Sequence, residues 1–283
     1  MRRSNELSDQ LTTMSTMVEL TSAFEGIASL RIAQIRDQVL HSQQFFADLW
    51  HIYTQIRVDE VFRSGHTQSS TKSIDKDLLI LVTAEGSFSG DIDRRLINDA
   101  LDAYDSNKNA IVVIGRHGAN ILAQRGVGIE HSFKTPEHDL NINTGPLIDI
   151  VKKYRSTTVY YQQYKSLMSQ AIKRIQLSTA IIERGSQVDR PDEIIDDRNY
   201  IFEPSTYAVV DHLENSMMQI MLGEVILESK LAQYASRFKA MSLAHERAQD
   251  SFSDVNVKYN RARRQEKDER LKETINGLRK AEV

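Results

Sequence analysis

The sequence predicts an α/β protein in which a long antiparallel coiled coil, formed by the two chain ends, carries a small inserted α/β domain. Residues 206–276 contain no proline and a single glycine, and apolar residues recur there in steps of three and four. A second such stripe runs from 4 to about 63, with strand-like apolar runs between the two. We therefore expect an N-terminal helix over 1–63, an α/β domain over 74–204 and a C-terminal helix over 205–283.

The N-terminal helix is predicted from an apolar stripe that no proline interrupts. This stripe would be exposed to water unless another helix packs against it. The C-terminal segment carries the same kind of seam, and a helix of that extent would span roughly 100 Å, too long to pack inside a compact globule. The two ends of the chain should therefore pair. The N-terminal stripe comprises Leu7, Leu11, Met14, Met17, Leu20, Phe24, Ile27 and Leu30.

Between the helices, short apolar runs alternate with amphipathic stretches, which is typical of an α/β (Rossmann-like) domain with parallel strands. A polar stretch at 64–71 separates this domain from the first helix. The expected strands are 78–82, 110–114 and 157–161, with an extended strand from 171 to 182. The expected helices are 92–104, a short helical stretch after 115–118 that ends near 124, and 144–154.

The two apolar seams also predict a register for the helix pair. Antiparallel pairs whose residue numbers sum to about 262 place Leu7 opposite Val255 and Phe24 opposite Phe238, so that apolar side chains meet apolar side chains. A slip of one heptad preserves the stripe and is the nearest alternative. In the preferred register, everything past about Arg261 is unpaired and projects as a single helix.

Composition restricts the class of protein. The chain has 36 basic and 39 acidic residues, a net charge of -3, which gives no general reason to expect nucleic acid or an anionic membrane as a partner. With no cysteine, disulfides, cysteine metal sites and thiol catalysis are excluded. No apolar run approaches the length of a membrane span, and the first residues lead into an amphipathic pattern, so we expect neither a membrane helix nor a secretion signal.

Motifs that would carry chemistry are largely missing. The sequence has no phosphate-binding loop of the G-x-x-x-x-G-K-[ST] type, so we expect no direct nucleotide binding, no cofactor and no catalytic residue. Residues 86–90 (GSFSG) have Phe88 where a nucleophile elbow needs serine. His117 and the cluster 137–139 lack paired ligands at helical spacing, so we interpret them as solvated loop residues and expect no metal site. The basic run at 261–272 is interleaved with acidic residues, which disfavours nucleic acid.

Several short motifs stand out along the chain. In the N-terminal helix and the central domain they are 20–24 (LTSAF) and 82–91 (VTAEGSFSGD), and near the C-terminus they are 200–205 (YIFEPS), 227–230 (LESK), 237–241 (RFKAM) and 259–263 (YNRAR). Together they resemble motifs of the gamma subunit of F-type rotary ATP synthases. The most specific match lies near the C-terminus, and the likeness covers nearly the whole chain.

The resemblance implies a divergent member of this family, a non-catalytic central-stalk rotor. Its paired helices would turn inside a ring of alpha and beta subunits, and its α/β domain would sit beside the epsilon subunit and the membrane c-subunit ring. Ion flow would thereby be coupled to ATP synthesis or hydrolysis at the beta subunits. The chain would lie at the cytoplasmic face of the bacterial plasma membrane, held there by its partner subunits.

The same resemblance assigns contact residues. For loops of the beta subunits, the candidates are basic positions, because guanidinium groups stay charged and pair with carboxylates. An apolar tip would contact the sleeve of the ring, and a loop of the α/β domain would make the foot contacts. These three sets are Arg31, Arg237, Arg261, Arg263 and Arg264; Leu271, Ile275 and Leu278; and Glu85, Phe88 and Asp91.

The residues taken alone leave a second hypothesis open, a coiled-coil adaptor or scaffold whose α/β domain recognises another protein. The apolar tail from Leu271 to Leu278 helps to separate the two. A shaft turning in a sleeve needs an apolar stripe beyond its paired region, whereas a free adaptor would leave that stripe in water.

Overall fold

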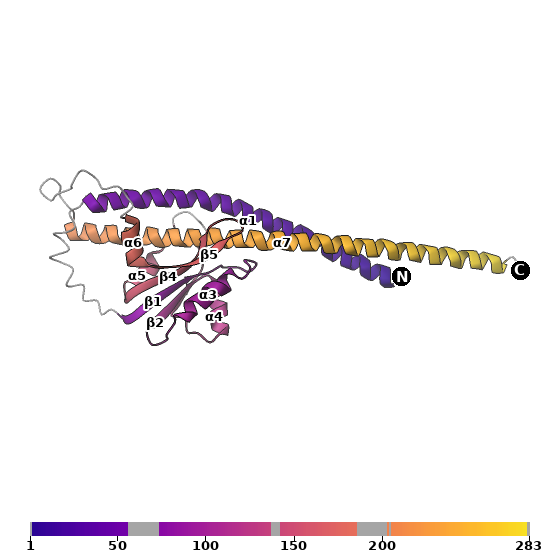
Figure 1. The fold of residues 1–283 in the computed structure, drawn as a ribbon, viewed down its shortest axis with the longest axis horizontal. Helices are drawn as coiled ribbons and strands as arrows, with labels where there is room; N and C mark the ends of the chain where they lie inside the picture. Colours follow the sequence, from indigo (N-terminus) through magenta and orange to yellow (C-terminus); the bar gives the residue numbers. More distant parts are fainter. Residues whose placement is uncertain (1, 56–73, 137–141, 186–202, 204, 282–283) are drawn as a thin grey trace. The chain divides into compact units, whose positions relative to one another are not determined.

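The computed structural model describes residues 2–55, 74–136, 142–185, 203 and 205–281. They form two compact units: one of 1–28 with 238–283, and one of 29–237. The predicted fold class, with its long terminal helices and central α/β sheet, is confirmed (Figure 1). The division into three segments drawn from the sequence stays a prediction.

Two long helices contribute to both units: α1 (Arg2–Gln55) and α7 (Thr206–Ala281). Helix α7 begins one residue after position 205, where the expected C-terminal segment starts. The part of the expected N-terminal helix after Gln55 lies outside the described residues. In the first unit the two helices pair, and His245 Nδ1 of α7 lies 3.1 Å from the Val18 carbonyl oxygen and 3.4 Å from Thr21 Oγ1 of α1.

The predicted register is wrong at the outer end of this pair. Leu7 lines a shared hollow with Lys258, Arg261 and Ala262, three to seven positions beyond its expected partner Val255. Sliding one helix along the other by a turn or a heptad keeps the apolar stripes in contact. The apolar pattern alone therefore could not distinguish the predicted register from a shifted one. The unpaired end of α7 therefore begins later than predicted, and from 267 to 277 every residue is exposed.

The second unit is built around a five-stranded sheet in the order β3-β2-β1-β4-β5. The first four strands are parallel, and β5 runs antiparallel to β4. This order places the central strand β1 where the chain switches from one half of the sheet to the other, as in doubly wound folds. The strands are β1 (Ile74–Val82), β2 (Asn109–Ile114), β3 (His131–Phe133), β4 (Tyr154–Tyr164) and β5 (Gln170–Gln176).

Alternate residues of β1 point to opposite faces of the sheet, and both faces are covered. On one face, Leu79 and Leu81 pack with α3 (Ile92–Asp102) and α4 (Arg116–Gln124). On the other, Leu78 and Ile80 pack against α5, α6 and the long helices (Figure 1). These two short helices span Gly145–Val151 and Leu177–Gly185.

Apart from shifts of a few residues at the ends of other elements, two elements differ from the sequence-based expectation. Strand β3 was not predicted, because it is three residues long and only its last residue is apolar. The expected strand from 171 to 182 ends at Gln176, and α6 begins at Leu177. Leu177, Ala180 and Ile181 follow a helical spacing and pack into the core, a pattern that the preceding alternation obscured.

Candidate functional site

Polar side chains gather at the carboxyl edge of the parallel sheet, where β1 and β2 end. Thr83 follows β1, and its Oγ1 lies 2.9 Å from the carbonyl oxygen of Ile114, the last residue of β2. The same Oγ1 accepts the N–H of Gly118 at 3.1 Å, which joins the first turn of α4 to the end of β1. In doubly wound sheets this edge is where functional sites form.

Asp93, in the first turn of α3, is the centre of this edge. Its carboxylate is 1% exposed and accepts hydrogen bonds from Gln162 Nε2 at 2.8 Å and from the N–H of Ala84 at 3.2 Å. His117 Nδ1 lies 2.7 Å from Asp93 Oδ2. The interpretation of His117 as a solvated loop residue is therefore wrong, because its ring is paired with a buried carboxylate. That hydrogen bond raises the pKa of His117 above its usual 6.5, while burial opposes the shift. The cluster 137–139 lies outside the described residues.

The hydrogen-bonded chain continues from the sheet into α7. Gln162 Oε1 accepts a hydrogen bond from Ser229 Oγ and another, at 3.3 Å, from Gln233 Nε2. Gln233 Nε2 is also 3.1 Å from Ser229 Oγ. All three side chains are buried. A continuous polar network thus runs from His117 through Asp93 and Gln162 to the long helix.

A second polar contact joins α7 to the loop that follows β1. Ser236 Oγ donates to the carbonyl oxygen of Ser89 at 2.7 Å, and Arg237 Nη2 donates to Ser89 Oγ at 3.2 Å. The Arg237 guanidinium also stands 5.1 Å from the centroid of the Tyr234 ring. Arg237, which the sequence suggested for contact with beta subunits, is thus engaged within its own chain.

The three foot candidates lie in or beside this loop. The Glu85 carboxylate is held within the chain, with Oε1 2.8 Å from Arg116 Nε and Oε2 accepting the N–H of Thr135 at 3.1 Å. Phe88 is 58% exposed and has a φ of 71°, unusual for a residue with a side chain. Asp91 is exposed at the N-terminus of α3. Phe88 and Asp91 are therefore presented to solvent, whereas Glu85 supports the loop from within.

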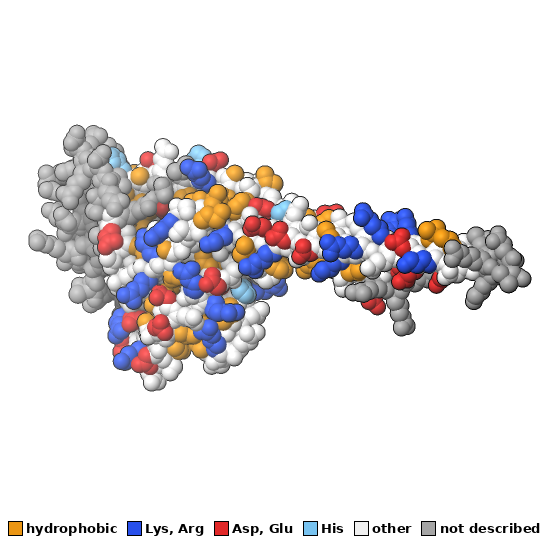
Figure 2. Space-filling model, turned by 45° about the vertical axis from the view of Figure 1, so that its right-hand side comes forward, with side chains coloured by type: hydrophobic (Ala, Val, Ile, Leu, Met, Phe, Trp, Pro, Cys, Tyr) orange, Lys and Arg blue, Asp and Glu red, His pale blue; other side chains and the backbone are white. Residues whose placement is uncertain are grey.

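The shaft candidates are mostly on the surface. Arg31 is exposed and donates to Gln34 Oε1 on its own helix at 3.3 Å. Arg261 lines the hollow of the first unit, and Arg263 and Arg264 are exposed. In Figure 2, basic and acidic side chains are interspersed along the exposed length of α7.

The predicted apolar tip is also largely accessible. Leu271 is 62% exposed and Ile275 is 43% exposed, so both could contact a second protein. Leu278 belongs to α7, and its side chain lies outside the described residues.

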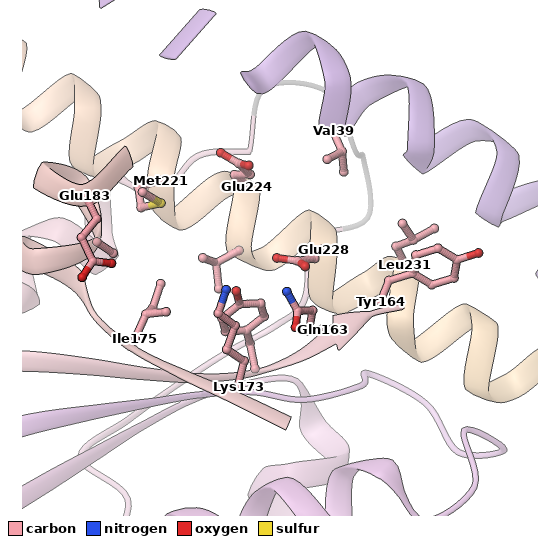
Figure 3. A pocket seen from close by; sticks show the side chains of 13 residues that line it. Val39, Gln163, Tyr164, Lys173, Ile175, Glu183, Met221, Glu224, Glu228 and Leu231 are labelled. Atoms are coloured by element: carbon pink, nitrogen blue, oxygen red, sulfur yellow. The ribbon is translucent and has the colours of Figure 1, made fainter. Parts of the chain in front are cut away.

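A cavity of about 480 Å³ lies beside α7 in the second unit. Its walls come from α1, the strands β4 and β5, α6 and α7, and Lys173, Gln163 and Glu228 point toward one another across it (Figure 3). Among the described residues, no group of three or more histidine or carboxylate side chains could hold a metal ion. No helix in the described part of the chain is long and apolar enough to cross a membrane.

Sequence reasoning missed Asp93, Gln162, Ser229 and Gln233 as members of one network. Three of them carry a signal in the sequence: Gln162 follows directly on the apolar run 159–161, and Ser229 and Gln233 lie one turn apart on one face of the long helix. The sequence does not show that these positions meet, because Ser229 and Gln233 are 67 and 71 residues away from Gln162 along the chain.

The fold and this edge define the class of protein: an α/β domain inserted between two long helices and hydrogen-bonded to the second of them. The family model described as ATP synthase matches residues 3–279. The chain therefore belongs to the ATP synthase family.

Relatives agree over nearly the full length of the chain. It is 26% identical to the ATP synthase gamma chain of Chloroherpeton thalassium and 22% identical to that of Staphylococcus haemolyticus, with 96% of both chains covered in each case. A chain in the mitochondrial ATP synthase of Euglena gracilis has the same fold, with a TM-score of 0.67 at 13% identity over 98% of this chain and 93% of that chain. A chain from the central stalk and c-ring of the Tetrahymena thermophila enzyme gives a TM-score of 0.54 at 16% identity, over 80% of this chain and 99% of that one.

Proposed function

We propose that this chain is the central-stalk rotor subunit of an F-type ATP synthase, and that it couples ion translocation to ATP synthesis or hydrolysis without catalysing either reaction. The observation that carries the proposal is the family match over residues 3–279, on a chain whose paired helices and α/β unit have the fold of F-type stalk subunits. Rotation needs a stiff element long enough to reach the catalytic sites, and α7, at 76 residues, provides one.

The partners follow from that role. The structural relatives come from an OSCP/F1/c-ring assembly and from a central stalk/c-ring assembly. By analogy, the partners of this chain are the alpha and beta subunits around the helix pair, and the epsilon subunit and c-ring beside the α/β unit. The chain is held at the cytoplasmic face of the bacterial plasma membrane through those subunits. Phe88 and Asp91 are the exposed foot candidates, and Leu271 and Ile275 are the exposed sleeve candidates.

Reconstitution tests this function directly. We expect the isolated chain to show neither ATP hydrolysis nor nucleotide binding in calorimetry, because it lacks a phosphate-binding loop. Mixed with alpha and beta subunits, it should co-purify with them and confer sustained ATP hydrolysis with rotation of a bead attached to the α/β unit. Micromolar binding of ATP to the chain alone, or failure to co-purify, would contradict the proposal, and the second result favours the adaptor hypothesis.

The exposed arginines of α7 give a further prediction. Arg261→Ala combined with Arg263→Ala should leave the free energy of unfolding of the isolated chain within about 1 kcal/mol of wild type, since exposed charges contribute little to stability. The same double variant should reduce the torque or the coupled ATPase rate of the assembled complex. Arg95→Ala with Arg174→Ala, which removes two exposed arginines from the α/β unit, is the control and should leave torque unchanged. Unfolding of the free chain with normal torque in the complex would show that Arg261 and Arg263 are structural.

A further inference from the structure

One part of the contact between α7 and the sheet is apolar. Met217, Leu222 and Ile226 are buried in the core on the face of the sheet that α7 covers. Apolar burial is non-directional, and a helix with an apolar stripe keeps similar contacts when it slides by a turn. These contacts hold α7 against the α/β domain, but they fix its position along the axis and its rotation only weakly.

The cavity beside α7 weakens that control further. Val225, Glu228 and Leu231 line it from the helix, and Ile175 and Glu183 line it from β5 and α6 (Figure 3). Where a void faces a side chain, the partner atoms that would resist its displacement are missing. On this side, packing leaves α7 room to shift.

The polar network supplies what the apolar contacts lack. Gln162 is held in one orientation, because its Nε2 faces the buried Asp93 carboxylate at 2.8 Å. Its Oε1 is therefore aimed at Ser229 and Gln233. A shift of α7 by one residue, about 1.5 Å along the axis and 100° around it, would break these bonds and leave buried polar groups unsatisfied.

The contact at Ser89 lies further along the same helix. Ser236 is seven residues, or two turns, beyond Ser229, so both serines lie on nearly the same side of α7. It donates to the Ser89 carbonyl oxygen at 2.7 Å, and both residues are buried. Two directional contacts about 10 Å apart along the axis fix both the rotation and the position of a helix.

We propose that this polar latch, defined as Gln162, Ser229 and Gln233 together with Ser89 and Ser236, holds α7 in place on the α/β domain when torque passes through the chain. The inference rests on the proposed rotor function and assigns positioning residues to it. Torque loads α7 against the α/β domain in every turn, and a displaced helix could not remake the hydrogen bonds of the latch. Loss of the latch should let the helix turn without carrying the α/β domain fully with it.

The test compares a latch variant with a packing variant in the complete membrane-bound enzyme. Ser229→Ala with Gln233→Leu removes both donors to Gln162, and Ile226→Ala removes apolar packing of the same helix at a core position. Ser216→Ala is the matched serine control, because the Ser216 hydroxyl donates only to the His212 carbonyl oxygen of its own helix among the hydrogen bonds of the described residues. The readouts are the thermal midpoint of the isolated chain, the ATP hydrolysis rate, and ATP-driven ion pumping into vesicles.

We expect the latch variant to retain hydrolysis but to pump severalfold fewer ions per ATP. Ile226→Ala should lower the thermal midpoint by at least as much and yet keep the wild-type pumping ratio, and Ser216→Ala should match wild type throughout. Normal pumping in the latch variant overturns the inference, and so does a pumping loss that follows the thermal midpoint in both variants. If the double variant does not assemble, Ser229→Ala alone is measured against the same outcomes. A wild-type chain that supports no coupled hydrolysis contradicts the rotor function itself and is thereby distinguished from failure of the latch.

Discussion

Replacing Gly115 by alanine is expected to lower the free energy of unfolding of the chain by about 3 kcal/mol, through combined backbone strain and overpacking. Gly115 has a φ of 101°, and a Cβ added there would lie 2.2 Å from the carbonyl oxygen of Thr83. This neighbour is backbone and cannot rotate away. It is also fixed, because the N–H of Thr83 is bonded to the Ile114 carbonyl oxygen at 2.7 Å.

Two other glycines separate the causes of that loss. Gly126 also has a positive φ, 70°, but an added Cβ there would meet nothing within 4 Å, so Gly126→Ala should cost about 1 kcal/mol from conformation alone. Gly128 has neither a positive φ nor a neighbour within 4 Å, and Gly128→Ala should be nearly neutral. Urea unfolding of the three variants measures the differences. Equal losses for Gly115→Ala and Gly126→Ala would mean that the close approach to Thr83 relaxes freely.

The predictability of this fold depends on how local each determinant is. The strands at 78–82 and 110–114 were predicted because a continuous apolar run is a property of neighbouring residues. The long helices were predicted for the same reason, from a periodic pattern that no proline interrupts. Strand β3 has no such pattern, since His131 and Ser132 are exposed, and it exists because it pairs with β2.

The candidate site was less predictable, because its members are brought together by topology. Asp93 and His117 are 24 residues apart, and only the parallel arrangement of β1 and β2 brings the helices that follow them to one edge. The register at the outer end of the helix pair was predicted wrongly for a different reason. A repeating apolar seam determines which faces of two helices pair, but it does not determine their relative position along the helix axes.

Removing the Asp93 carboxylate should produce the second large effect. Asp93→Ala leaves the Gln162 amide and the Ala84 N–H without their buried acceptor, and we expect a loss of about 3 kcal/mol in the free energy of unfolding. Asp93→Asn keeps the size of the side chain and one acceptor oxygen but removes the charge, so it should cost less than Asp93→Ala. Chemical unfolding at constant pH orders the three proteins.

The pH dependence of these stabilities identifies the role of His117. Because the hydrogen bond to Asp93 raises the pKa of His117 above 6.5, the stabilisation from this pair is fully present below that value and is lost as pH rises through the higher folded-state pKa. The stability gap between wild type and Asp93→Asn should therefore be larger near about pH 6 than near about pH 9. Glutamine cannot gain a proton, so the difference in the free energy of unfolding between wild type and His117→Gln should show the same pH dependence. A gap that is equal at both pH values would mean that His117 is not charged in the folded chain, and that Asp93 is held there by Gln162 and the backbone alone.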